Sequence, residues 1–340
     1  MSREIAARKD AVLPVELATA PPREHDFALV VGVEHYPRFR SLRGAAADAQ
    51  AFHAWVCSPD GGAVPADNAR LVVSTEEPVA PLQDQIDDAL EELILAADRA
   101  SGGRRLYFYF SGHGATDDTQ LPDNVALLLA KWSLHRERVA LSSSEYWGKL
   151  AGLGLFEEIA VFLDCCRSTA RGAVGLPPTV ALRDRMSVPR PTKTFIAFAA
   201  EAARPAFELP VGGLWQGVFT RRLLAILRGS PAGIAAAALK DRLEGEVPDD
   251  RAGQRAEVKT DFRAAARFGR RGTLPELHIT FRRARNTVTL LDGALQPIAS
   301  HTVTAEPWVI PLASGLYLLS DSLSEQSIKH QGGEVTDVEF

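Results

Sequence analysis

Two apolar segments of the chain each end in a short motif of small and polar residues. RRLYFYF (residues 104–110) is followed by SGHG (111–114), and EIAVFLD (158–164) is followed by CCRS (165–168). Short apolar runs rich in aromatic and β-branched residues are typical of buried strands in a parallel sheet. Loops that leave the carboxyl ends of neighbouring strands meet in one crevice. The pattern therefore predicts a parallel sheet that brings a histidine and a cysteine together.

The surrounding sequence supports the same fold class. Strand-like and helix-like segments alternate from about residue 27 to residue 230, which predicts an α/β fold with a mostly parallel sheet flanked by helices. Strands are expected at 26–33, 68–74, 104–110, 125–130, 158–164 and 193–200, and helices at 45–56, 81–100 and 217–227. The 81–100 segment is the clearest helix, because its apolar residues recur every three or four positions.

Changes in composition divide the chain into parts. Residues 1–26 are expected to be a flexible tail and 27–262 the main domain, within which 170–193, with four prolines and five basic residues, reads as a long exposed loop. A basic stretch bounded by glycine and proline, 263–274, is expected to be a linker. Short β-rich segments separated by turns follow, so 275–340 is predicted to be a small all-β module.

Charge and cysteine content exclude several classes of protein. The net charge of −5 gives no reason to expect nucleic acid or an anionic membrane as a partner, and no apolar run is long enough to span a bilayer. Three cysteines, two of them adjacent, do not form a disulfide framework, and no spacing completes a zinc site. We therefore expect reduced thiols, no metal and a cytoplasmic location.

The two motifs can support nucleophilic chemistry. A thiol is mostly protonated at neutral pH, so a catalytic cysteine needs a base, which His113 can supply. The backbone N–H groups of Gly114 and Cys166 are candidates to stabilise an oxyanion. A rival pattern is C-x5-R, formed by Cys165 and Arg171, as in phosphatase loops. Asp164 and the lack of glycine within this loop argue against phosphate binding there.

In five segments the sequence resembles the caspase and metacaspase group of cysteine peptidases. These are FALVVGVEHY (27–36), LRGAAADA (42–49), YFSGHG (109–114), FLDCCRS (162–168) and the stretch from residue 198 to 224. His113 precedes the second cysteine of the pair by 53 residues, which is similar to the caspase spacing of about 50. The resemblance implies a caspase-like fold, a protein or peptide substrate, Cys166 as the nucleophile and His113 as its partner.

The match is not complete around the nucleophile. Metacaspases usually have histidine and glycine where this chain has Arg167 and Thr169. The caspase pattern has glutamine and glycine at the positions of Asp164 and Ser168. These differences leave both reacting residues in place but leave the shape of the loop open.

The resemblance also implies a substrate preference. It places Asp48, Ser111 and Asp164 in the S1 pocket, which holds the side chain before the scissile bond (P1). Two carboxylates in one pocket would repel an acidic P1 residue and favour arginine or lysine. Arginine fits best because its planar fork binds a carboxylate through two hydrogen bonds.

Self-cleavage is a further expectation from the resemblance, since relatives are often cut in the loop after the nucleophile. The candidate sites are basic residues that would fit the predicted pocket: Arg171, Arg183, Arg185, Arg190 and Lys193, and also Arg270 and Arg271. The alternative is that these side chains only keep a loop soluble.

Two other functions stay open. One is a catalytically silent scaffold of the same fold that binds partners. The other is a peptidase that acts within a bacterial signalling or defence system and is switched on by a protein partner. No cofactor is expected. Calcium activates some metacaspases, but this chain has no dense cluster of acidic ligands that could bind it.

Overall fold

The computed structural model describes residues 25–117, 123–170, 172–180, 191–230, 233–246, 254–263 and 266–269. In the C-terminal part it describes 276–282, 287–293, 295–304, 307–312, 315–330 and 336–340. The predicted tail lies outside the described residues up to position 24. Its last residue, Asp26, is instead the first residue of a buried strand.

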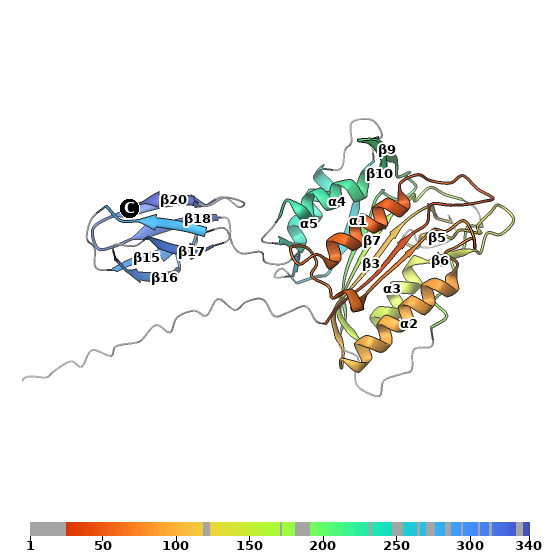
Figure 1. Ribbon diagram of the computed structural model, residues 1–340, viewed down its shortest axis with the longest axis horizontal. Coiled ribbons are helices and arrows are strands. Elements are labelled where there is room, and N and C mark those ends of the chain that lie inside the picture. Colours follow the sequence, from red (N-terminus) through yellow and green to blue (C-terminus); the bar gives the residue numbers. More distant parts are fainter. Residues whose placement is uncertain are drawn as a thin grey trace, which may run out of the picture.

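A six-stranded sheet forms the centre of the main domain (Figure 1). Its order is β12-β8-β7-β3-β1-β2, and every pairing is parallel except that of β12 with β8. The strands are β1 (Asp26–Gly32), β2 (Ala69–Val73), β3 (Gly103–Ser111), β7 (Phe156–Asp164), β8 (Lys193–Phe198) and β12 (Glu257–Thr260). The predicted mostly parallel sheet is confirmed.

Helices cover both faces of this sheet, as Figure 1 shows. One face is covered by α1 (Ala45–Cys57), α4 (Val218–Arg228) and α5 (Ala236–Glu246), and the other by α2 (Gln83–Arg99) and α3 (Ser143–Gly152). Strand β3 explains the continuous apolar runs in the sequence. Tyr107 and Tyr109 enter the core on the α1 side, and Leu106, Phe108 and Phe110 enter the other core. Both faces of each central strand are thus buried.

Smaller sheets surround the main one. The predicted strand 125–130 is not part of the main sheet but forms β5 (Ala126–Leu128), between β4 (Gly114–Ala115) and β6 (Ala140–Ser142). A hairpin of β9 (Glu208–Val211) and β10 (Leu214–Gly217) precedes α4. The pair β11 (Ile234–Ala235) and β13 (Arg267–Phe268) and the short η1 helix (Ala66–Asn68) complete the domain. The sequence did not indicate the β9–β10 hairpin, α5 or β12.

The loop predicted at 170–193 is less exposed than expected. Ala173 and Gly175 are buried. Leu176 binds the edge of β6, donating its N–H to Ala140 O at 2.7 Å and accepting from Ser142 N at 2.8 Å. Leu176 therefore adds a single bridge to the edge of the small sheet, because backbone groups there were free to pair, while Pro177 and Thr179 are exposed. Lys193 belongs to β8, and residues 171 and 181–190 lie outside the described part.

The predicted linker 263–274 also packs on the main domain in part. The Phe268 ring is buried, 4.8 Å from that of Phe195. The Arg105 guanidinium lies 4.7 Å above the Phe268 ring and donates to Arg267 O at 2.8 Å. A buried aromatic ring and a cation thus hold residues 266–269 against the sheet. Residues 270–275 are outside the described part of the chain.

The C-terminal residues form two further sheets with their own core. One sheet has the order β17-β14-β20 and the other β16-β15-β18-β19. The strands are β14 (Glu276–Thr280), β15 (Thr287–Leu291), β16 (Pro297–Thr302), β17 (Trp308–Pro311), β18 (Gly315–Ser320), β19 (Glu325–His330) and β20 (Thr336–Glu339). Leu277, Ile279 and Leu290 are among the residues that fill this core. This confirms the all-β character expected for the end of the chain.

In the part of the chain that the structure describes, none of the helices has the length and apolar character needed to cross a membrane.

Candidate active site

The two motifs of the sequence leave neighbouring strands at the same level. Ser111 at the end of β3 pairs with Asp164 at the end of β7, and Gly112 N donates to Asp164 O at 3.2 Å. His113 and Cys166 each lie two residues beyond this pair. Both line a cavity of about 270 Å³ at the carboxyl end of the sheet.

The same cavity contains the residues predicted for the S1 pocket. Asp48 from α1, Ser111 and Asp164 all line it. The structure therefore brings together five of the residues singled out in the sequence. It adds others that the sequence analysis did not assign: Arg40, Leu42, Phe207, Glu208, Trp215 and Gly217.

His113 is held by its ring and by its backbone. Its Nε2 lies 2.7 Å from Arg40 O. A carbonyl oxygen only accepts, so Nε2 carries a proton and Nδ1 is the unprotonated nitrogen of the neutral ring. Its backbone N–H donates to the Tyr36 hydroxyl at 3.0 Å, and the Tyr36 and Phe39 rings lie 4.8 and 5.0 Å from the imidazole. Burial lowers the pKa of His113, which favours the neutral ring that can accept a proton.

The Cys166 thiol is half-buried beside the backbone of Ala206. Ala206 N donates to Sγ at 3.3 Å, and Ala206 O lies 3.5 Å from Sγ. Burial raises the pKa of Cys166, with a contribution from the charge of Asp164. The thiol is thus protonated at neutral pH in the free protein. Attack by its sulfur would require a base to remove that proton.

Gly114 allows the two motif loops to touch. A Cβ at position 114 would lie 2.5 Å from Cys166 O and 2.6 Å from Cys165 Sγ, so only glycine fits without a shift of the backbone. Cys165 is 3% exposed and packs with the core, whereas Cys166 is partly exposed. Of the two adjacent thiols, Cys166 is the accessible one.

Two buried carboxylates lie side by side in the cavity wall. Asp48 Oδ2 accepts from Gly217 N at 2.7 Å, and Asp164 Oδ2 accepts from Thr220 N at 3.0 Å and Thr220 Oγ1 at 2.6 Å. Gly217 lies between them, since a Cβ there would overlap Asp164 Oδ2. The Oδ1 atoms of both aspartates have no hydrogen-bond partner among the described residues.

The electrostatics of this pair favour a cation. Asp48 and Asp164 are 4% and 6% exposed. Burial raises the pKa of both, and the charge of Asp164 raises that of Asp48 further. Glu208, which accepts from Arg43 N and Gly44 N at 2.9 Å each, adds a third carboxyl to the cavity. A guanidinium or ammonium in the cavity would relieve this repulsion.

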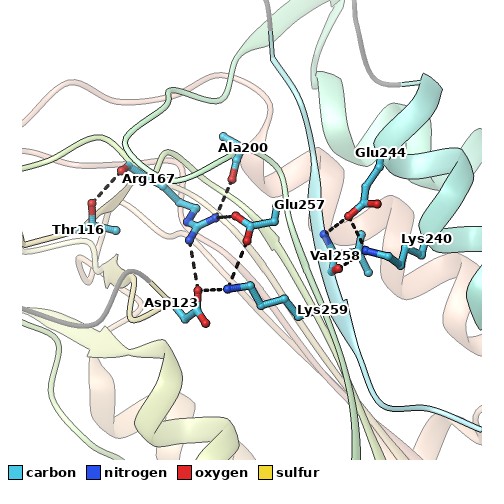
Figure 2. A network of polar contacts seen from close by, with 9 residues as sticks. All are labelled: Thr116, Asp123, Arg167, Ala200, Lys240, Glu244, Glu257, Val258 and Lys259. Atoms are coloured by element: carbon cyan, nitrogen blue, oxygen red, sulfur yellow. Dashed lines mark hydrogen bonds and ion pairs between the residues drawn. The ribbon is translucent and has the colours of Figure 1, made fainter.

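Arg167, where metacaspases have histidine, is not among the residues that line the cavity, and Figure 2 shows its guanidinium beside Glu257 and Asp123. It is 1% exposed. Its guanidinium pairs with Glu257 of β12, lies 3.6 Å from Asp123 and sits 4.2 Å above the Phe198 ring. Figure 2 also shows Lys259 between Asp123 and Glu257. This network fixes the residue after Cys166 to the edge of the sheet.

The remaining predictions are not placed by the structure. The proposed self-cleavage residues Arg171, Arg183, Arg185 and Arg190, and also Arg270 and Arg271, lie outside the described residues. Within the described ranges, no three His, Cys, Asp or Glu side chains lie close enough to share a metal ion. The independence from a cofactor stays a prediction.

Two neighbouring strands end at one cavity and place an imidazole and a thiol there. This is the arrangement of the class of proteins in which a histidine can activate a cysteine. Within that class, this chain belongs to the caspase domain family of peptidases, which it matches over residues 25–288.

The chain is also similar to individual known proteins. The chain is 31% identical over 222 residues to a probable protease from a Desulfuromonadales bacterium. The matched residues make up 60% of this chain and 26% of that protein. It thus spans about a quarter of the relative's length. Among solved structures, caspase-1 of Spodoptera frugiperda is 11% identical, with a TM-score of 0.47 over 74% of this chain and 90% of that one. The Drosophila initiator caspase Dronc is 12% identical, with a TM-score of 0.45 over 76% and 87%.

Proposed function

We propose that the protein is a cysteine endopeptidase that cleaves after arginine or lysine, with Cys166 as the nucleophile and His113 as the general base. The observation that carries the proposal is one cavity lined by a half-buried thiol, a neutral imidazole and two buried carboxylates. Each of these groups has a separate part in the proposed reaction. No metal or organic cofactor is needed for it.

The reaction begins when Cys166 Sγ attacks the substrate carbonyl carbon and its proton passes to His113 Nδ1. The C–N bond then breaks, and His113 gives this proton to the leaving amine. Water hydrolyses the resulting thioester with His113 again as the base. Among the described residues Cys166 N–H has no hydrogen-bond partner, so it is available to the oxyanion. Gly114 N–H, on the adjoining loop, is the second proposed donor.

Asp48 and Asp164 would receive the P1 side chain. Their Oδ2 atoms are held by protein donors, so the Oδ1 atoms are left for the substrate. A guanidinium can bind two carboxylates at once, which favours arginine over lysine. An aspartate in this cavity would meet like charge. The same acidic lining, and the burial of Cys165, count against the C-x5-R phosphatase reading.

A panel of fluorogenic peptides that differ only at P1 tests this proposal. We expect kcat/KM for P1 arginine to exceed that for alanine or aspartate by at least about 100-fold, since a desolvated pair of carboxylates is left unpaired otherwise. Cys166→Ala should abolish turnover, while Cys57→Ala serves as the matched control and should retain it. Cleavage after aspartate, or activity in Cys166→Ala, would contradict the proposal. Absence of turnover with every peptide would favour the scaffold alternative or an enzyme that needs an activating partner.

Self-processing is a separate part of the proposal. Arg171, Arg183, Arg185 and Arg190 follow the nucleophile in a basic stretch and would suit an acidic pocket. We expect the purified protein to show fragments that end at one of these residues, and Cys166→Ala to stay intact. Intact masses measured by mass spectrometry decide it, and identical masses for both proteins would end the idea.

The wider setting rests on the sequence, with the cytoplasmic location taken from the cysteine content. We propose a cytoplasmic peptidase of a bacterial signalling or defence system, which a protein partner switches on. A wild-type enzyme that is fully active when pure would argue against the activating partner.

A further inference from the structure

A second cavity, of about 290 Å³, is lined mainly by cations. Its lining consists of Pro37, Arg38, Val79, Lys131 and Arg136. The three basic side chains are exposed. In the ranges that the structure describes, none of the three lies within ion-pair distance of a carboxylate. An unneutralised group of three cations around a hollow attracts an anion.

Two nearby carboxylates contact other groups. Glu76, on the same loop as Val79, lies 3.8 Å from His35. Glu137, next to Arg136, points its carboxylate at Gly172. The backbone beside the cavity is held by hydrogen bonds, because Arg136 N donates to Ser133 O at 2.8 Å and Trp132 Nε1 donates to Glu137 O at 3.2 Å.

The basic cavity lies on the His113 side of the active site. Arg38 and Lys131 are the chain neighbours of Phe39 and Trp132. The Phe39 ring is 5.0 Å from the His113 ring and 4.8 Å from the Trp132 ring. The loop after β1 thus serves both cavities, with Arg40 in the acidic one and Arg38 in the basic one.

The proposed reaction indicates which part of the substrate would reach the basic cavity. The acidic cavity takes the side chain before the scissile bond. His113 must reach the leaving amine, which is the first atom of the part of the substrate after that bond. That part of the substrate therefore passes His113 and continues toward the basic cavity. An extended peptide advances about 3.3 Å per residue, so its second to fourth residues would arrive there.

We propose that the basic cavity binds an acidic side chain at the second to fourth position after the scissile bond. This inference rests on the proposed function and narrows it to substrates with a basic residue before the cut and an acidic one shortly after it. The opposite charges of the two cavities would also fix the direction in which the substrate lies.

Internally quenched peptides with arginine at P1 test the inference. Three otherwise identical peptides carry glutamate, glutamine or lysine at the second to fourth positions after the cut. We expect kcat/KM for the glutamate peptide to exceed that for the lysine peptide by about threefold to tenfold at low ionic strength, since exposed ion pairs contribute modestly. The difference should shrink at high salt.

A triple variant, Arg38→Gln/Lys131→Gln/Arg136→Gln, should lose this preference. It should cleave a P1-arginine coumarin amide, which has no residues after the scissile bond, as fast as the wild type does. The control Arg99→Gln/Arg228→Gln/Lys329→Gln removes the same charge from exposed positions outside both cavities and should keep the preference.

The outcomes separate this inference from the proposed function. If the wild type cleaves the coumarin amide but does not prefer glutamate, the inference is wrong and the proposed function stands. A preference that persists in the first triple variant, or that is lost equally in the control, also overturns it. If the wild type cleaves neither substrate type, both proposals fail for the protein on its own.

Discussion

Tyr36 shows how a single hydroxyl can position a reacting group. It accepts from His113 N and donates to Leu128 O, both at 3.0 Å, and so bridges two backbones that run side by side. The side chain is 1% exposed, and burial raises its pKa, so the hydroxyl stays protonated and continues to donate. Its ring also packs on the imidazole. Tyr36 is therefore a positioning residue for His113.

Replacing Tyr36 by phenylalanine keeps the ring and removes the bridge. We expect kcat for a P1-arginine peptide to fall about tenfold with little change in KM, because a small misplacement of a reacting group slows the chemical step. The free energy of unfolding should fall by about 1–3 kcal/mol, because a buried donor and a buried acceptor lose their partner. Tyr107→Phe, which removes a buried hydroxyl far from the cavity, should lower stability alone. Full kcat in Tyr36→Phe would refute the positioning role.

Sequence reasoning could not find Tyr36 in this role, because the bridge joins residues that are 77 and 92 positions apart. His113 and Cys166 could be found because each follows a strand directly, and the carboxyl ends of neighbouring parallel strands converge. Glu208 was missed for a different reason. It lies in a short hairpin whose residues are mostly exposed or half-buried, so no apolar pattern marked it.

At the scale of elements, β12 matters for the site although, among the described strands of the main sheet, it alone pairs antiparallel. Glu257 of β12 pairs with Arg167, and Lys259 joins Glu257 to Asp123. Arg167 N also donates to Arg204 O at 2.9 Å, close to the Ala206 backbone that contacts Cys166. The edge of the sheet thus holds the nucleophile loop. The same arrangement accounts for an arginine at a position where metacaspases have histidine.

Arg167→Ala should both lower the stability of the protein and slow peptide cleavage. Arg167 is buried but its partner Glu257 is 30% exposed, so losing the guanidinium should cost about 1–3 kcal/mol, and the loop that carries Cys166 would lose its anchor. We expect kcat to fall while Arg167→Lys retains part of both properties. Arg70→Ala, which breaks a pair with Glu92 at β2, on the opposite edge of the sheet, is the control and should change kcat little. Thermal unfolding and peptide turnover give the readouts, and unchanged values for Arg167→Ala would refute the anchor.

For the whole molecule, the acidic cavity should lower the free energy of unfolding of the substrate-free protein as pH rises. The pKa values of Asp48 and Asp164 are raised in the folded state, so the folded chain binds more protons than the unfolded one. Stability from this source is therefore complete at low pH, and it is lost as pH rises from about 4, the unfolded value, through the raised folded values. Substrate binding sites often carry such a cost.

Asp48→Asn tests this effect. Asparagine can still accept from Gly217 N but carries no charge, so the melting temperature at pH 7.5 should rise by about 3 °C. The gain should disappear near pH 4, and cleavage after arginine should be largely lost. Asp60→Asn, at an exposed position, should leave both properties unchanged. A lower melting temperature for Asp48→Asn at pH 7.5 would contradict the account of the cavity.

The central claim is that one thiol, activated by one imidazole, faces a pocket made for a positive side chain. Labelling with peptide chloromethyl ketones that end in arginine or aspartate, followed by mass mapping of the adduct, tests it directly. We predict one adduct per chain from the arginine reagent, on Cys166 and not on Cys57 or Cys165, and much slower labelling in His113→Ala. Equal labelling by the aspartate reagent, or an adduct on another cysteine, would contradict the account.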